Sequence, residues 1–271
     1  MVTEKLTVVL AVLFLFGLTR PVAAEMSKDQ AYSLFSQANQ SFREANSARN
    51  TEQAEKLYEK AILVFERIIN EGGIKNAKLY YNLANAYFLK GDIGKAILNY
   101  RRAEKLDNSD ANIQKNLAFA RSKRIDRVAM KTEKRVLQTL FFWHYDFSIK
   151  AKFLFTCIFF GVVCICVAGI IWFGRSAPWM IPAVICAILT TCFLVSLVIE
   201  SATKAGRICG VITIGEVVAR QGDGQNYAPS FKEPLHEGTE FVLLESRPGW
   251  FHIELSDNSD AWIPQISADL V

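Results

Sequence analysis

Cysteine and histidine side chains are the first places to look for catalysis or metal binding, and the chain carries six Cys and three His. Five of the cysteines lie in two long apolar runs, where they serve as small apolar side chains. Cys164 and Cys166 lie two positions apart, so a helix would point them to nearly opposite faces. The sequence shows neither zinc-ligand spacing nor a disulfide framework. We therefore expect no metal and no cofactor.

The histidines do not complete a catalytic group in the sequence. His144 has no other residue of ligand type at suitable spacing except Asp146, and we interpret it as an interfacial residue. His236 and His252 have no cysteine near them except Cys209, so a cysteine–histidine peptidase is a poor match. We expect no catalytic residues and predict that the protein is not an enzyme.

A helical pattern runs from Lys28 to about Arg135, with apolar and small residues at three and four spacing and no proline. It is clearest at Ala77–Asp110, where Gly91 and Asp92 separate two helices. The residues expected to face inward are Tyr80, Leu83, Ala84, Tyr87, Ala96, Tyr100 and Ala103. This spacing resembles the tetratricopeptide repeat (TPR), whose period is about 34 residues, and departs from its signature only at Asn108, where a proline is usual.

Two further copies flank this repeat. A looser one spans Tyr32–Asn70, with an expected long loop at residues 46–53. Another begins at Ala111–Arg124 and carries Arg121 where an aromatic would sit, which suits the charged outer face of a capping helix. We predict an all-α TPR solenoid over residues 25–135. The resemblance implies a groove lined by the first helix of each unit, and the residues expected to face it, unless they are plain solvated side chains, are Asn82, Asn85, Lys115 and Asn116.

Charge is divided unevenly along the chain. Residues 101–135 contain eleven basic and five acidic side chains, a net charge of +6, whereas residues 208–271 contain three basic and ten acidic ones, a net charge of −7. The two surfaces could simply be solvated, they could attract each other, or the basic one could touch anionic lipid headgroups. Nothing in the pattern indicates nucleic-acid recognition.

Two uncharged runs, residues 153–173 and 180–199, are each long enough to cross a bilayer at about 1.5 Å per residue. The six residues Gly174–Trp179 between them permit only a tight turn, so we predict a transmembrane hairpin that returns the chain to its starting side. The alternative is a buried hairpin in a soluble core. Residues 136–152 form a basic and aromatic segment suited to the headgroup layer.

Residues 1–24 read as a secretory signal peptide, with an apolar core at Leu6–Leu18 and small residues before Glu25. An uncleaved anchor is the alternative, and either one exports the helical region after it. The positive-inside rule opposes this topology, because the inner loop has only Arg175, whereas the outer ends carry Lys150, Lys152, Lys204 and Arg207.

The last part of the chain, residues 208–271, changes to short β-rich runs separated by glycine and proline turns, which predicts a small antiparallel barrel. The order Val218–Arg220, Leu235–Thr239, Gly249–Trp250 and Ala261–Pro264 resembles bacterial SH3 (SH3b) domains. Members of that family bind peptides, cell-wall components or neighbouring domains. The resemblance implies either a binding groove or core packing for Tyr227, Trp250 and Trp262.

The order of these parts, with signal peptide, TPR repeats, two-helix hairpin and small all-β SH3-like barrel, describes a multidomain membrane protein and resembles BatE-type proteins of the Bacteroides aerotolerance (Bat) group. The resemblance implies a partner role beside membrane proteins with von Willebrand factor A domains. We expect a bacterial inner-membrane scaffold or adaptor, with both soluble modules extracytoplasmic, that binds protein partners. The alternative is an envelope sensor or cell-wall anchor whose SH3-like domain grips peptidoglycan.

Overall fold

The computed structural model describes residues 26–126, 140–145, 147, 149–174 and 176–271. The expected signal peptide, most of the basic stretch after Asp126 and residues 136–139 lie outside the described residues. The chain forms two compact units, residues 1–75 and 76–271, and each is described by itself.

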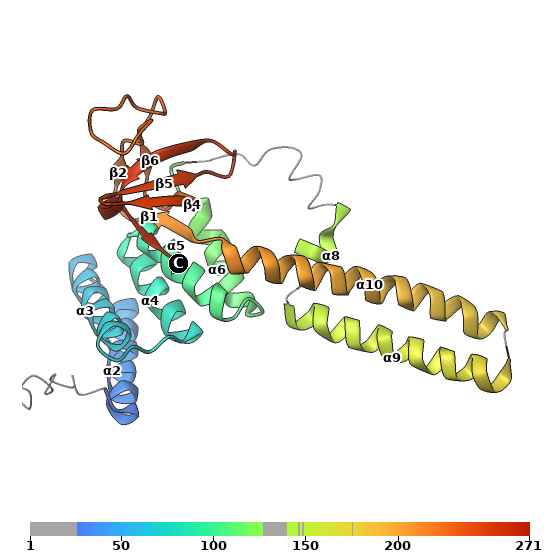
Figure 1. Cartoon of the computed structure of the whole chain (residues 1–271). Coiled ribbons are helices and arrows are strands. Elements are labelled where there is room, and N and C mark those ends of the chain that lie inside the picture. Colours follow the sequence, from blue (N-terminus) through green and yellow to red (C-terminus); the bar gives the residue numbers. More distant parts are fainter. Residues whose placement is uncertain (1–25, 127–139, 146, 148, 175) are drawn as a thin grey trace, which may run out of the picture. The chain divides into compact units, whose positions relative to one another are not determined.

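The first unit is a pair of packed helices, α2 (Lys28–Ser47) and α3 (Thr51–Asn70) (Figure 1). Ser27 starts α2 with a reciprocal capping box to Gln30, which satisfies two backbone donors at once. The helices pack through aromatic pairs, with the Phe35 and Phe65 rings 5.9 Å apart and the Phe42 and Tyr58 rings 5.8 Å apart between their centres. The fully buried residues of this unit include Ala38, Ala61 and Phe65.

The long loop expected in this unit is wrong. Only residues 48–50 connect α2 and α3, because the Asn50 side chain accepts a hydrogen bond from Glu52 N and so starts α3 at Thr51. Most of residues 46–53 therefore belong to α2 or α3.

The second unit begins with three helices, α4 (Ala77–Lys90), α5 (Ile93–Leu106) and α6 (Ala111–Ser122). Gly91 ends α4 with a φ of 97°, a value that favours glycine, and Asp92 then caps α5 through Lys95 N. The inward face expected for this repeat is confirmed, since all seven of its residues are buried: Tyr80, Leu83, Ala84, Tyr87, Ala96, Tyr100 and Ala103.

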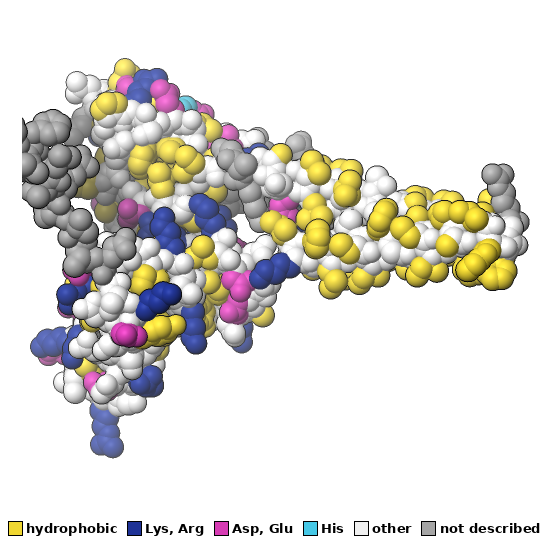
Figure 2. All heavy atoms as spheres, turned by 60° about the horizontal axis from the view of Figure 1, so that its bottom comes forward, with side chains coloured by type: hydrophobic (Ala, Val, Ile, Leu, Met, Phe, Trp, Pro, Cys, Tyr) yellow, Lys and Arg dark blue, Asp and Glu magenta, His cyan; other side chains and the backbone are white. Residues whose placement is uncertain are grey.

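A hairpin follows, made of α9 (Ile149–Phe173) and α10 (Ala177–Gly206), with the short α8 (Phe142–Tyr145) before it. Figure 1 shows α9 and α10 lying side by side, and Figure 2 shows hydrophobic side chains covering them along their length. Both helices are long and apolar enough to cross a membrane. At the turn the Trp179 ring lies so close to Gly169 that a Cβ there would be 2.6 Å from it.

The carboxy-terminal part is an antiparallel sheet in the order β6-β5-β4-β1-β7, with a separate two-stranded ladder β2-β3. The strands are β1 (Cys209–Ile212), β2 (Glu216–Val217), β3 (Leu235–His236), β4 (Glu240–Arg247), β5 (Trp250–Glu254), β6 (Asp260–Pro264) and β7 (Ala268–Leu270), and the 3₁₀ turn η1 (Gln265–Ser267) joins the last two. The core on one face includes Ile212, Phe241, Ile253 and Ile263.

The small antiparallel barrel that the sequence predicts is not closed. Strand β4 is long and irregular between Leu243 and Glu245, which bends the sheet, but β6 and β7 do not pair with each other in the described ladders. The outer edge of β6 is instead taken by Arg220, whose backbone exchanges two hydrogen bonds of 2.8 Å with Trp262. The sheet therefore stays open.

Candidate protein-interaction surfaces

The structure brings two of the expected groove residues together on neighbouring helices. Asn85 on α4 accepts a 3.0 Å hydrogen bond from the Asn116 amide on α6, and the same amide donates to the Tyr81 hydroxyl at 3.0 Å. Asn85 Oδ1 also accepts a 2.5 Å hydrogen bond from Tyr100. These four side chains, which we call the amide–tyrosine network, hold α4 and α6 against each other.

Tyr100 supports this network from α5, behind it. Its side chain is fully buried, and burial raises the pKa of its hydroxyl far above the usual range, with the nearby Tyr81 adding to the shift. The hydroxyl is therefore a permanent donor to Asn85. The buried hydroxyl of Tyr100 thus orients the half-buried side-chain amide of Asn85.

Beside the network the surface of α4 and α6 is aromatic and basic. The Phe88 and Phe119 rings lie 5.5 Å apart, and Phe119 is 54% exposed. Lys123 Nζ lies 5.2 Å from the centre of the Phe119 ring, within the range of a cation–π contact. Lys115 is exposed and Asn82 is half-buried.

We call this polar, aromatic and basic set of side chains on α4 and α6 the groove residues: Tyr81, Asn82, Asn85, Phe88, Lys115, Asn116, Phe119 and Lys123. Neither helix contains an Asp or Glu. Sequence reasoning missed four of them, Tyr81, Phe88, Phe119 and Lys123. Phe119 follows Asn116 by three positions, so helical spacing alone could have placed it on the same face.

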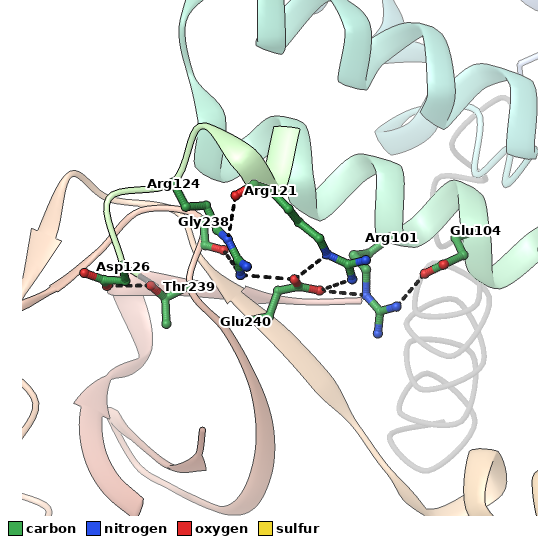
Figure 3. A network of polar contacts seen from close by, with 8 residues as sticks. All are labelled: Arg101, Glu104, Arg121, Arg124, Asp126, Gly238, Thr239 and Glu240. Atoms are coloured by element: carbon green, nitrogen blue, oxygen red, sulfur yellow. Dashed lines mark hydrogen bonds and ion pairs between the residues drawn. The ribbon is translucent and has the colours of Figure 1, made fainter. Parts of the chain in front are cut away.

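A second cluster joins α5, α6 and the residues just after α6 to the sheet, and Figure 3 shows it at close range. Glu240, at the start of β4, accepts two hydrogen bonds of 2.7 Å from Arg121 in a bidentate pair. Arg101 Nε lies 3.2 Å and Arg124 Nη1 3.3 Å from the same carboxylate. Burial acts to raise the pKa of Glu240, but the pairing with Arg121 and the two other arginines outweighs it, and the net pKa is lowered.

Asp126 makes the reverse contact, from the helical part to the sheet. Its carboxylate accepts hydrogen bonds of 2.6 Å from the His236 backbone N–H and from the Thr239 hydroxyl, and His236 Nδ1 lies 2.7 Å from it. Burial opposes ionisation, yet these hydrogen bonds prevail and the pKa of Asp126 is below its usual range.

Backbone groups complete the contact. Gly94 N–H, at the start of α5, donates to Glu237 at 3.0 Å, Arg102 donates to the Leu270 carbonyl at 2.8 Å, and Lys105 donates to the Val271 oxygen at 2.9 Å. We call the whole set, from both sides, the helix–sheet joint. Its members are Gly94, Arg101, Arg102, Lys105, Arg121, Arg124, Asp126, His236, Glu237, Gly238, Thr239, Glu240, Leu270 and Val271.

The joint decides between the interpretations of the uneven charge. Attraction between the basic and acidic parts is confirmed for Arg101, Arg121, Arg124 and Glu240. The expectation that Arg121 belongs to a charged outer face of a capping helix is wrong, because its guanidinium pairs with Glu240 instead of facing water.

The three aromatic candidates of the sheet are placed differently from one another. Trp262 is only 8% exposed, with the His252 ring stacked at 4.6 Å and the Arg247 guanidinium 4.6 Å from its ring centre. Trp250 is half-buried. Tyr227 is 51% exposed, and its ring packs on Gly222 so closely that a Cβ there would be 2.7 Å from it. Of the three, Tyr227 offers the most surface to a ligand.

The base of the hairpin holds a polar cluster. Lys152 is fully buried, pairs with Glu200 across the two helices, and donates to the His144 carbonyl at 2.6 Å. His144 Nδ1 lies 2.7 Å from the Ser196 hydroxyl. The charge count treated Lys152 as a solvated flanking cation, but the structure buries it. Among the described residues no group of three or more His, Cys, Asp or Glu could hold a metal ion.

Comparison with known proteins supports the helical interpretation. Residues 45–109 match a tetratricopeptide repeat family model. A comparison with curated proteins found no match to the chain. The matched residues cover α3, α4 and α5, so the helical part of the chain is TPR-like, and TPR domains generally mediate protein–protein interaction.

Proposed function

We propose that the protein is a non-enzymatic membrane scaffold whose TPR helices bind an extended segment of a partner protein. The observation that carries this proposal is the combination of the TPR match over residues 45–109 with the groove residues on α4 and α6. The amides can pair with a peptide backbone, and the exposed Phe119 ring offers apolar contact.

Charge favours an acidic partner segment. The groove helices and the cap of α6 carry Lys78, Lys90, Lys115 and Lys123, and α4 and α6 have no carboxylate of their own, so an acidic chain gains attraction and meets no like charge on them. We propose that a segment with carboxylates and at least one large apolar side chain is the occupant.

We propose further that the hairpin spans the bacterial inner membrane and that both soluble parts are extracytoplasmic. The joint contributes support, since it links residues before the hairpin to residues after it and so requires both on one side. The pairing of Lys152 with Glu200 also removes one of the cations that opposed export under the positive-inside rule.

The sheet supports an SH3-like interpretation, because its central strand β4 is long and irregular and a 3₁₀ turn leads from β6 to β7. With a TPR, a hairpin and this sheet in that order, the chain resembles the BatE-type proteins of the Bat group. On that resemblance we propose membrane proteins with von Willebrand factor A domains as partners, in a complex for aerotolerance or envelope stress.

Site-specific photo-crosslinking in intact cells tests the groove. A photoreactive amino acid at Phe119, which is exposed, should capture a partner, and Lys115→Glu should weaken that capture. Lys60→Glu is the matched control, because it makes the same charge change at an exposed position of α3. A groove that captures nothing, or a Lys115→Glu variant that behaves like Lys60→Glu, would contradict the proposal.

Protease treatment of intact spheroplasts tests the topology, with an epitope placed after Val271. Loss of the epitope from intact spheroplasts is the expected result. An epitope that survives until the cells are lysed would place both soluble parts in the cytoplasm and move the search for partners there.

A cell-wall anchor or envelope sensor is the second candidate, favoured by the exposed ring of Tyr227 near the Arg247–Asp223 ion pair. An exposed aromatic ring can stack on a sugar face. The test is co-sedimentation of the full chain with purified peptidoglycan, compared with the Tyr227→Ser variant. Sedimentation that depends on Tyr227 would favour this candidate, and its absence would leave the peptide groove.

A further inference from the structure

The sheet, which the sequence presents as a separate ligand-binding module, is docked on the chain's own TPR helices. Side chains and backbone groups of the helix–sheet joint make this contact, and the ionic part centres on one carboxylate, Glu240. A carboxylate that meets three guanidinium groups at once is held more firmly than an ordinary surface ion pair, because one of the pairs is bidentate and all are half-buried.

The two surfaces also fit closely. Gly94 on α5 lies so near β1 that a Cβ there would be 2.8 Å from the Ile212 carbonyl oxygen. Across the same contact, Gly238 has a φ of 83°, and a Cβ on it would be 3.0 Å from Ile97 and from Arg124. Glycine therefore leaves room for the strand backbone at Gly94 and for the Ile97 and Arg124 side chains at Gly238, so the two surfaces are in direct contact.

The connection to the hairpin is short on the sheet side. Only Arg207 and Ile208 separate the end of α10 from the start of β1. On the other side, residues 123–148 lie between the end of α6 and the start of α9. The short linker therefore keeps the sheet close to the hairpin. The TPR helices, in turn, contact the sheet through the joint.

We propose that the sheet serves as an intramolecular dock, which holds α5 and α6 through Glu240 and so sets the position of the groove at the end of the hairpin. The segment Glu237–Glu240 of the same chain occupies the surface that Arg101, Arg121 and Arg124 form. This role is independent of any ligand of the groove and of any ligand of the sheet's aromatic residues.

Two backbone amides report directly on the joint. Gly94 N–H is among the first four amides of α5, which have no partner within a helix, and its acceptor is Glu237. His236 N–H donates to Asp126. The amide of Ile253, in the central β4–β5 ladder and fully buried, reports on the sheet itself.

The test is hydrogen–deuterium exchange at single-residue resolution on the full chain in detergent. The variants are Glu240→Arg, Arg121→Glu and the charge swap that combines them. We expect each single variant to raise exchange at Gly94 and His236 at least tenfold and to leave Ile253 within about twofold of the unsubstituted chain. The swap should recover part of the protection at Gly94 and His236 relative to Glu240→Arg, because a carboxylate at position 121 then faces a guanidinium at position 240, while Arg101 and Arg124 still lie beside it.

The proposal is overturned if either single variant leaves the Gly94 and His236 amides protected, because the sheet would then not be held through Glu240. If a single variant instead unfolds the sheet and exposes Ile253, the swap decides: slower exchange than in Glu240→Arg at all three amides supports the dock, and a swap as exposed as Glu240→Arg refutes it. None of these measurements uses groove binding, so a failed dock and a failed groove remain distinguishable.

Discussion

Replacing Tyr100 by Phe should weaken the packing of α4, α5 and α6, and with it the proposed groove, by a small, defined amount. The hydroxyl of Tyr100 donates to Asn85 at 2.5 Å from a side chain that is 2% exposed. Removing it leaves only the space of one oxygen atom, because the rings have the same size, and Asn85 Oδ1 still accepts from Asn116. The cost is therefore that of one neutral hydrogen bond, about 1 kcal/mol, and not the larger penalty of an unsatisfied buried group.

Hydrogen–deuterium exchange of the full chain measures this cost, because protection scales with the free energy of local opening. A loss of about 1 kcal/mol corresponds to roughly fivefold faster exchange, expected for the amides of α5 and for Asn85 on α4. The matched control is Tyr58→Phe, which removes the same group from a hydrogen bond of 2.7 Å to Asn46 in the first unit. That variant should speed exchange in α2 and α3 and leave α5 unchanged.

The reasoning fails if Tyr100→Phe leaves α5 protection as it was, or if Tyr58→Phe disturbs α5 as strongly. Photo-crosslinking from Phe119 adds a second readout. Since Tyr100 directs the Asn85 amide, Tyr100→Phe should lower capture of the partner severalfold, whereas Tyr58→Phe should not change it.

Three further perturbations probe the joint and the hairpin. The pKa of Asp126 is lowered in the folded chain, so its contribution to stability is present above the unfolded value near 4 and is lost as pH falls through the folded value. Protection of His236, corrected for intrinsic exchange, should drop there, and Asp126→Asn should reduce the dependence without abolishing it, because the pKa of Glu240 in the same joint is also lowered. Lys152→Met takes the ammonium away from Glu200 and should cost about 3–5 kcal/mol, seen as less protein in membranes, whereas Lys152→Met combined with Glu200→Met should recover it. Gly94→Val should force α5 from Ile212 and speed exchange at His236, while Gly161→Val in α9, where a Cβ meets nothing within 4 Å, should leave that amide unchanged.

The helical repeat and the hairpin were predictable because their signals are local. A helix buries residues at three and four spacing, so the inward face that includes Tyr80 and Leu83 could be named from the sequence and is buried in the structure. Gly91 marks a helix end by its conformational freedom, and two uncharged runs of about 20 residues indicate membrane-crossing length by composition alone. Residues 1–24 lie outside the described residues, and the signal peptide stays a prediction.

The contacts that assemble these parts were not predictable, because they pair residues far apart in the chain. Arg121 and Glu240 are 119 positions apart, and ten acidic residues of the last segment were equally available to the arginines before the fold selected one. The same holds for Lys152 and Glu200, which composition presents as separate flanking charges. Whether the sheet closes also depends on which backbone reaches the edge of β6, and there Arg220 takes the place that a barrel would need. Periodicity and turn residues thus determined the elements. How the sheet and the TPR helices meet was determined by long-range pairing of charges and backbone edges, which only the tertiary structure decides.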